Sequence, residues 1–225
     1  MRPLKTSITA IIILSASACF AQVGQQTDTS KAPVKELAKV ETEASYPGGN
    51  DAWKVFIEKN MQSNVPFKKK APIGKYPAVV EFIVDKDGAV SNVTAVTKFD
   101  YGMEDELIRV IEKSGKWSPA MQNGKPLKAY RKQPVTFLVE SPDFKINTTE
   151  PYTLFTNTDN EVTVTAKKIK AADLSIIVSG GKVISSGNET FIVRVSKPGR
   201  VTIEIVNNKK DDKEIGVVSF EVKAK

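Results

Sequence analysis

With 225 residues the chain can hold one or two domains with a sizeable core, and it contains no histidine and a single cysteine, Cys19. This composition excludes a Ser–His or Cys–His nucleophile system and a Cys/His zinc site, so we predict a protein that is not an enzyme, with no catalytic residue, no metal, no cofactor and no evident small-molecule substrate. The net charge of +7 lies in lysine clusters without interleaved aromatic residues, which argues against nucleic-acid binding and leaves two readings open: solvated loops, or attraction to anionic lipid or cell-wall polymer.

Residues 1–21 have the pattern of a secretion signal peptide. Two basic residues, Arg2 and Lys5, precede a short apolar run, Ile8–Leu14. The run is too short to span a bilayer, and small residues of the kind that a signal peptidase reads follow it. We therefore predict that the protein is exported and periplasmic.

Two processing sites fit this signal. Cys19-Phe20-Ala21 offers small residues at the two positions that are read, which predicts cleavage between Ala21 and Gln22. In the alternative reading, Ala16-Ser17-Ala18-Cys19 imitates a lipoprotein site and Cys19 carries the lipid. The stretch that follows, residues 22–45, is polar and rich in Gln, Thr, Lys and Glu, so we predict a flexible linker.

The first predicted helix lies within Tyr46–Met61, with Asn50 as the candidate N-cap. Trp53, Phe56 and Ile57 recur at helical spacing and form an amphipathic stripe. An aromatic stripe of this kind more often packs in a core than binds a ligand. We therefore assign it to the core, and we read the stretch 62–76 as a basic loop.

A β-hairpin is predicted next. Ala78–Val84 alternates between apolar and polar residues, and Ala89–Thr97 is rich in Val and Thr, as strands are. Asp85-Lys86-Asp87-Gly88 between them is turn chemistry, because Gly88 can adopt a positive φ. The two strands are therefore expected to pair.

A second helix and a third strand follow the hairpin. Met103–Ser114 has apolar residues at helical spacing, acidic residues in its first turn and Gly115 at its end. We expect Trp117, just beyond this helix, to be buried against Phe82. Pro134–Val139 is predicted to be the third strand.

This region resembles the C-terminal domain of TonB, the energy transducer of Gram-negative envelopes, and most closely the variant common in Bacteroidetes. The motifs that carry the resemblance are Tyr46-Pro47-Gly48-Gly49, Phe82–Gly88, Trp117-Ser118-Pro119, Asn123-Gly124-Lys125-Pro126 and Pro134-Val135-Thr136-Phe137. The resemblance implies a domain over residues 46–140 with two helices on one face of a small antiparallel sheet.

The second half of the chain has a different pattern. Glu140–Lys145, which contains Ser141-Pro142-Asp143, reads as a short hinge, and short β-type runs with turn signals follow it without a helix. The expected strands are Tyr152–Thr156, Glu161–Thr165, Leu174–Val178, Thr190–Ser196, Arg200–Val206 and Ile215–Val222. This pattern predicts an all-β immunoglobulin-like sandwich over residues 146–225, so the fold class of the whole chain is α+β.

The second half also resembles the last domain of GldM, a periplasmic component of the gliding and type IX secretion machinery of Bacteroidetes. The residues that carry this resemblance are Asn160–Val164, Ala171–Ser175 and Phe191–Gly199. Because sandwiches of this kind host many functions, the fold alone does not decide what the domain does.

The third strand supplies the candidate site. Pro134 lacks a backbone N–H and suits an edge strand, and an extended peptide can add to such an edge. In TonB the corresponding strand receives the N-terminal segment of an outer-membrane transporter, so the resemblance implies that an envelope protein or peptide segment binds here. The predicted edge residues are Gln133, Val135, Thr136, Phe137, Leu138 and Val139, with Tyr130, Arg131 and Lys132 as flanking specificity residues.

Two alternatives remain open for this site. The second domain or a second copy of the chain, in a homodimer, can cover the same edge. At the level of function, we predict a periplasmic protein-binding module linked to TonB-dependent transmembrane transport. The alternative is a structural or accessory subunit of a gliding or type IX secretion machine.

Overall fold

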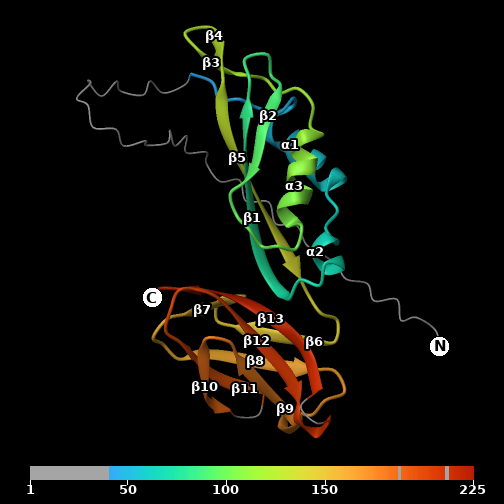
Figure 1. The fold of residues 1–225 in the computed structure, drawn as a ribbon, viewed down its shortest axis with the longest axis vertical. Helices are drawn as coiled ribbons and strands as arrows, with labels where there is room; N and C mark the ends of the chain where they lie inside the picture. The colour runs from blue at the N-terminus through green and yellow to red at the C-terminus, as the bar shows by residue number, and fades with distance from the viewer. Residues whose placement is uncertain (1–40, 187–188, 211–212) are drawn as a thin grey trace, which may run out of the picture. The chain divides into compact units, whose positions relative to one another are not determined.

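The computed structural model of the protein describes residues 41–186, 189–210 and 213–225 (Figure 1). The predicted signal peptide and most of the predicted linker lie outside the described residues. The described chain mixes helices with a larger number of strands, which agrees with the predicted α+β class. It divides into two compact units, the first formed by residues 41–65 and 77–136 and the second by residues 66–76 and 137–225.

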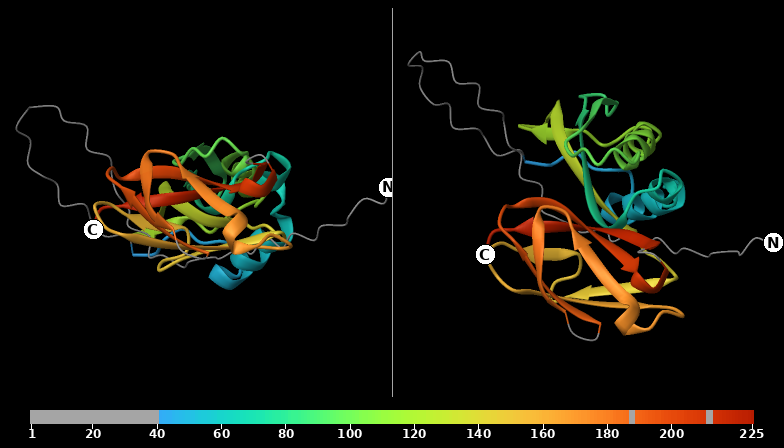
Figure 2. Two further views of the ribbon diagram at one scale, coloured as in Figure 1. Left: turned by 90° about the horizontal axis from the view of Figure 1, so that it is seen from below. Right: turned by 60° about the horizontal axis from the view of Figure 1, so that its bottom comes forward.

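In the first unit, two helices cover one face of a small group of strands (Figures 1 and 2). Strand β1 pairs with both β2 and β5, and β3 pairs with β4 in a separate short ladder. The elements are α1 (Gly49–Asn60), β1 (Ile73–Val84), β2 (Val90–Ala95), α3 (Met103–Glu112), β3 (Ala120–Gln122), β4 (Lys125–Leu127) and β5 (Ala129–Val139).

The start of α1 differs from the prediction. The helix begins at Gly49, the N-cap residue is Gly48 with φ 84°, and Asn50 already lies inside the helix. The N–H of Gly49 donates to the carbonyl oxygen of Tyr46 at 2.8 Å, which closes a tight turn before the helix. Because only glycine adopts this backbone conformation at low cost, the turn rather than an asparagine side chain fixes the helix start.

The hairpin of β1 and β2 has the predicted turn. Val84 pairs with Val90, and the N–H of Asp85 donates to the carbonyl oxygen of Ala89 at 2.8 Å. Gly88 has φ 82°, and its N–H donates to the carbonyl oxygen of Asp85 at 2.9 Å. The ends of the strands differ by a few residues from those predicted, as expected for sequence reasoning.

Trp117 lies at the centre of the core of the first unit. Its side chain is 5% exposed, and its ring centroid is 5.2 Å from that of Phe82, as predicted. It also lies 4.9 Å from the ring of Trp53 in α1, and its Nε1–H donates to Ser114 Oγ at 2.9 Å. The ring therefore joins α1, the end of α3 and β1 in one apolar cluster.

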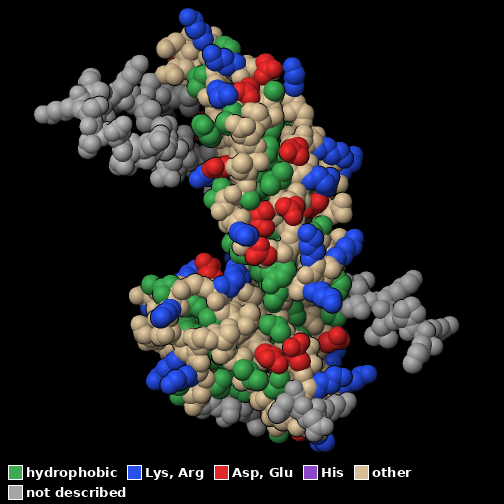
Figure 3. Space-filling model, in the orientation of Figure 1, with side chains coloured by type: hydrophobic (Ala, Val, Ile, Leu, Met, Phe, Trp, Pro, Cys, Tyr) green, Lys and Arg blue, Asp and Glu red, His purple; other side chains and the backbone are tan. Residues whose placement is uncertain are grey.

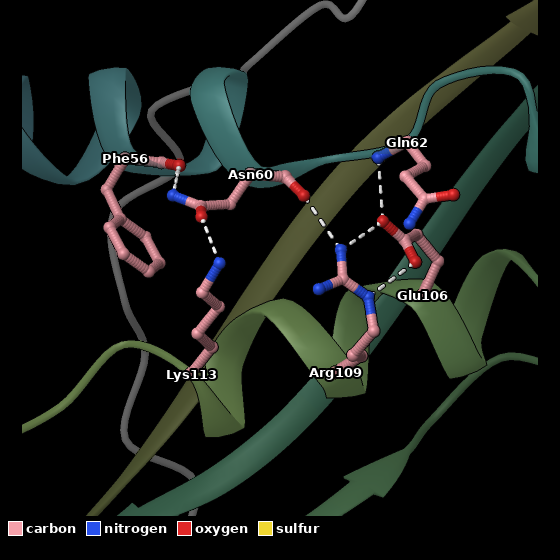
Figure 4. A network of polar contacts seen from close by, with 6 residues as sticks. All are labelled: Phe56, Asn60, Gln62, Glu106, Arg109 and Lys113. Carbon is pink, nitrogen blue, oxygen red and sulfur yellow. Dashed lines mark hydrogen bonds and ion pairs between the residues drawn. The ribbon is translucent and has the colours of Figure 1, made fainter.

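A polar network fastens the end of α1 to α3 (Figure 4). Glu106 Oε1 accepts from the backbone N–H of Gln62 at 2.7 Å and from Arg109 Nη2 at 2.6 Å. The same guanidinium donates to the carbonyl oxygen of Asn60 at 2.7 Å, and Lys113 Nζ donates to Asn60 Oδ1 at 2.9 Å. The network thus satisfies the carbonyl oxygen of Asn60, which helix geometry leaves open at the C-terminus of α1, and the N–H of Gln62 just beyond the helix.

Charge on Glu106 is needed for this network. Burial alone raises the pKa of Glu106, but the hydrogen bonds from Arg109 and from the Gln62 N–H outweigh it, so the pKa lies below its ordinary value. A carboxyl with a lowered pKa stabilises the folded state above the ordinary pKa, and the contribution is lost as the pH falls through the lowered value.

We therefore expect Glu106→Gln to cost roughly 1–3 kcal/mol of unfolding free energy at neutral pH, since the hydrogen bonds involve charged groups. The difference from the parent protein should shrink as the pH falls below about 4.3, the ordinary pKa of Glu. Denaturant unfolding at several pH values measures it, with Glu112→Gln, an exposed residue at the end of the same helix, as the control. A cost that does not change with pH would contradict the role assigned to this charge.

In the second unit two layers of strands enclose one core (Figures 1 and 2). One layer contains β13, β12, β9 and β7, and the other has the order β10-β11-β8-β6. The elements are α2 (Val65–Lys68), β6 (Phe144–Thr148), β7 (Thr153–Phe155), β8 (Asn160–Ala166), β9 (Leu174–Val178), β10 (Gly181–Ser186), β11 (Thr190–Val195), β12 (Gly199–Asn207) and β13 (Lys213–Lys223), with two short 3₁₀ turns.

The sequence locates most of these strands and misses two. The predicted runs correspond to β7, β8, β9, β11, β12 and β13, and both layers contribute buried residues to the core, among them Val162, Val193 and Ile203. Strands β6 and β10 are not predicted. Strand β6 begins at Phe144, so the predicted hinge is wrong for Phe144 and Lys145, and β10 begins at Gly181 of a predicted turn. Both strands form because β8 and β11 pair with them, which their turn-type residues do not indicate.

The beginning of β1 belongs to the second unit. Ile73 and Gly74 pair in parallel with Val218 and Ser219 of β13, so β1 starts at Ile73 rather than at the predicted Ala78. Tyr76 is 1% exposed, and the guanidinium of Arg200 lies 4.9 Å from its ring centroid. The prediction of a loop over 62–76 is therefore wrong in two places. Residues 65–68 form the short helix α2, and residues 73–76 belong to β1, because a partner far away in the sequence extends the strand.

Candidate protein-binding edge

Strand β5 has one backbone edge without a strand partner. Among the described residues β5 pairs with β1 and with no other strand. It runs from Ala129 to Val139, longer than the predicted Pro134–Val139, and opposite in direction to β1 (Figure 1). An edge of this kind presents N–H and C=O groups to which an extended segment can add.

The side chains of β5 alternate between two environments. Val135, Phe137 and Val139 are buried, with exposed fractions of 1%, 1% and 4%. The residues between them, Thr136 and Leu138, are partly exposed. The six predicted edge residues therefore comprise three core residues, which hold the strand in place, and three partly exposed ones, Gln133, Thr136 and Leu138.

Pro134 indicates which backbone groups face the open edge. A proline inside a strand is tolerated where its missing N–H would point away from the ladder. Its carbonyl oxygen accepts from the side chain of the preceding residue, Gln133 Nε2, at 2.8 Å. Since backbone groups alternate in direction along a strand, the N–H groups of Thr136 and Leu138 point to the same side as position 134.

The flanking residues fall into two groups. Tyr130 is 65% exposed, and Lys132 Nζ lies 3.9 Å from Glu81 Oε2 on the exposed face. Arg131 donates instead to Glu43 Oε2 at 2.8 Å. Of the predicted specificity residues, Tyr130 and Lys132 are therefore exposed, whereas Arg131 contacts the segment before α1.

Gln133 is also held by the fold. Its Oε1 accepts from the indole N–H of Trp53 in α1 at 2.6 Å. Glu43, the partner of Arg131, lies 88 positions away along the chain. Trp53, the partner of Gln133, lies 80 positions away. No local sequence signal could have found these two contacts.

The segment before α1 is also fixed. Thr42 pairs with Met121 and Ser45 with Ser118, both antiparallel, so residues 41–45, which the sequence assigns to a flexible linker, are ordered. The cause is again long-range pairing, which composition does not report.

An ion pair joins the turn of the β1–β2 hairpin to the residue just before β5, Lys128. The pKa of Asp85 lies below its ordinary value because Ser91 Oγ and Lys128 Nζ donate to the carboxylate, and the pKa of Lys128 is raised in turn. The Lys128 Nζ to Asp85 Oδ1 distance is 2.9 Å. Within the described parts of the chain no group of three or more Asp, Glu, His or Cys residues is placed to hold a metal ion.

Comparison with known families agrees with both resemblances and with their order. Residues 77–139 match the family described as Gram-negative bacterial TonB protein C-terminal, and residues 143–223 match the family described as GldM third domain. The second match is to the third domain of GldM, whereas the sequence resemblance was drawn to the last one. A search of curated proteins and a search of solved structures find no match.

The two matches indicate the kind of domain in each half of the chain. Both families consist of non-catalytic envelope domains that act as protein-interaction modules. No helix in the described part of the chain is both long and apolar enough to cross a membrane. The chain thus joins, in the predicted order, a region matching the TonB C-terminal family and a region matching the GldM third domain.

Proposed function

We propose that the protein is a non-enzymatic, periplasmic binding module of the cell envelope that takes an extended segment of a partner protein along the open edge of β5. One observation carries the proposal: β5 is an edge strand, and it lies within the residues, 77–139, that match the TonB C-terminal family. The partner we expect is an outer-membrane transporter, so the function belongs to TonB-dependent transmembrane transport.

The binding mode follows from the geometry of β5. The N–H groups of Thr136 and Leu138 donate to the incoming segment, which gives affinity with little dependence on its sequence. Selectivity comes from side chains on the exposed face, and Tyr130 and Lys132 are the candidates. Because Lys132 is cationic, an acidic residue in the partner segment is favoured.

Thr136→Pro tests this mode. The substitution removes one N–H from the open edge, and the ring also blocks the approach of a strand, so we expect partner binding to fall at least about tenfold. The ladder with β1 uses the other edge, so the circular dichroism spectrum should stay that of the folded protein. Thr136→Val has nearly the same shape and keeps the N–H, so it should bind as the parent protein does.

The measurement is capture from an envelope extract with the three proteins as bait, followed by mass spectrometry and titration of the captured partner. A partner that Thr136→Val retains and Thr136→Pro loses supports the proposal. If the folded Thr136→Pro protein captures the same partner with the same affinity, peptide addition at this edge is wrong.

A second candidate function rests on the match of residues 143–223 to the GldM third domain. In this case the second unit, which we take to be immunoglobulin-like, docks the protein as a structural or accessory subunit of a gliding or type IX secretion machine. Two fragments that divide the chain after Glu140, 41–140 and 141–225, distinguish the two, because they keep Thr42 with Met121 and the buried Phe144 with the second unit. Circular dichroism first checks that each fragment is folded, since residues 66–76 belong with the second unit. Capture of the partner by 41–140 favours peptide binding at β5, and capture by 141–225 favours the subunit role.

Export is the remaining element of the proposal. Cleavage between Ala21 and Gln22 should give a mature chain that begins at Gln22 and stays in solution after osmotic shock. The intact mass of the protein recovered from the periplasm checks this expectation. A mass that corresponds to a lipid-modified Cys19 would show that the lipoprotein reading is correct instead.

A further inference from the structure

The short helix α2 and the turn that follows it carry an exposed aromatic ring and three lysines. Pro66 is buried and anchors the turn, whereas the side chain of Phe67 is 49% exposed. Lys68, Lys69 and Lys70 follow directly, and all three are exposed. Figure 3 shows Lys and Arg side chains gathered where α2 is drawn in Figure 1.

The backbone holds this turn in a defined shape. The N–H of Ala71 donates to the carbonyl oxygen of Pro66 and the N–H of Lys70 to that of Phe67, both at 2.9 Å. These two bonds are those of a Schellman motif, which ends a helix with one residue in the left-handed conformation. Here that residue is Lys70, with φ 57°. Glycine adopts that conformation at lower cost, and the two backbone bonds hold Lys70 in it.

An exposed phenylalanine next to three lysines indicates which kind of partner surface this region can bind. Lysine is depleted from the centres of protein–protein interfaces, so a protein partner is disfavoured. An anionic polymer would pair with the lysines but leave the ring of Phe67 in water. At a bilayer surface the ring enters the boundary of the acyl chains, while the lysine stems bend to bring their charges to the phosphates.

We propose that Phe67, Lys68, Lys69 and Lys70, here called the basic turn, bind the headgroups of an anionic lipid surface. Three carboxylates, on Glu140, Asp143 and Glu214, line the same cavity as Phe67 and Lys70 in the second unit. They reduce the attraction, so binding requires a membrane rich in anionic lipid and weakens with added salt. Val139 at the end of β5 lines this cavity too, but lipid binding by the basic turn does not depend on peptide binding along β5.

The test is co-sedimentation of the chain from Gln22 onward, which contains every described residue, with vesicles. We expect binding to vesicles of phosphatidylethanolamine and phosphatidylglycerol, and none to vesicles of phosphatidylcholine. The triple variant Lys68→Ser/Lys69→Ser/Lys70→Gly should bind at least about tenfold more weakly, since each lysine near an anionic surface contributes about fivefold. Phe67→Ser should also weaken binding, although it leaves the charge unchanged.

A second lysine cluster in the same unit gives a matched control. Lys167, Lys168 and Lys170 are exposed, Lys168 has φ 63°, and the residue among them, Ile169, is partly buried rather than an exposed ring. Lys167→Ser/Lys168→Gly/Lys170→Ser therefore removes the same charge and relieves the same backbone conformation. We expect it to retain most of the binding.

Three results would overturn the proposal. One is equal binding to both kinds of vesicle, and another is equal loss in the control triple variant, which would mean that net charge alone acts. The third is unchanged binding of Phe67→Ser, which would mean that the ring does not enter the bilayer. Thermal melting of each variant shows that it is folded, so a loss of binding is not a loss of structure.

Discussion

Gly88→Ala should lower the unfolding free energy of the first unit, and by more than Gly124→Ala does. Gly88 has φ 82°, and a Cβ there would lie far inside van der Waals contact of the carbonyl oxygen of Trp117. The carbonyl oxygen is a backbone atom, and the backbone of residue 88 fixes the position of the added Cβ, so neither can rotate away. The carbonyl oxygen of Gly88 also accepts from the N–H of Trp117 at 2.9 Å, and the change would disturb this bond.

The expected cost is at least about 3 kcal/mol of unfolding free energy, because a left-handed alanine alone costs about 1–2 kcal/mol and the clash adds to it. Denaturant unfolding measures it. Gly124→Ala is the matched control, since Gly124 has φ 68° but no heavy atom within 4 Å of the added carbon. Equal costs for the two variants would mean that the close approach of residue 88 to residue 117 does not exist.

Trp117→Ala is expected to cost about 3–5 kcal/mol, the range for deletion of a buried aromatic side chain. Trp117 is 5% exposed and lies against Trp53, Phe82 and the ring of Tyr46, whose centroid is 5.7 Å away. Its removal leaves a cavity between α1 and β1 that these rings cannot fill without moving.

Trp117→Phe is the companion variant. It keeps most of the apolar volume and loses the hydrogen bond from Nε1 to Ser114 Oγ, so its cost should be clearly smaller than that of Trp117→Ala. Thermal melting and denaturant unfolding measure both. If Trp117→Ala melts at the temperature of the parent protein, the side chain does not belong to the core.

The parts of the fold that sequence reasoning finds are those fixed by local chemistry. The turn at Gly88 is predicted because a positive φ is required there, and α3 because its apolar residues and its acidic first turn agree. The contact of Trp117 with Phe82 follows once the hairpin and α3 are in place. Each of these signals lies within a few residues of the feature that it predicts.

The parts that are missed depend on partners far away along the chain. Strand β1 starts early because Ile73 pairs with Val218, and β10 forms because β11 pairs with it. The expected cap at Asn50 fails for a different reason, since the glycine turn before it already starts the helix. Pairing between distant strands costs loop-closure entropy and is stabilised by the burial that follows. A short window of sequence contains neither quantity.

The candidate site divides in the same way. The position of the edge strand comes from a resemblance that covers Pro134–Phe137, and the alternation of buried and exposed residues along β5 agrees with a strand. Arg131 and Gln133 are held by hydrogen bonds with Glu43 and Trp53, whereas Tyr130 and Lys132 are exposed. The resemblance contains no information on these contacts.

Hydrogen exchange at the amides of Thr136 and Leu138 tests the central claim most directly. With no partner present these amides should exchange faster than the amide of the intervening Phe137, which the same alternation from Pro134 assigns to the side of β1. Once the extended segment of a captured partner is added, both amides should become protected, and the amides of α3 should not change. Binding of that segment with unchanged exchange at Thr136 and Leu138 would contradict the account.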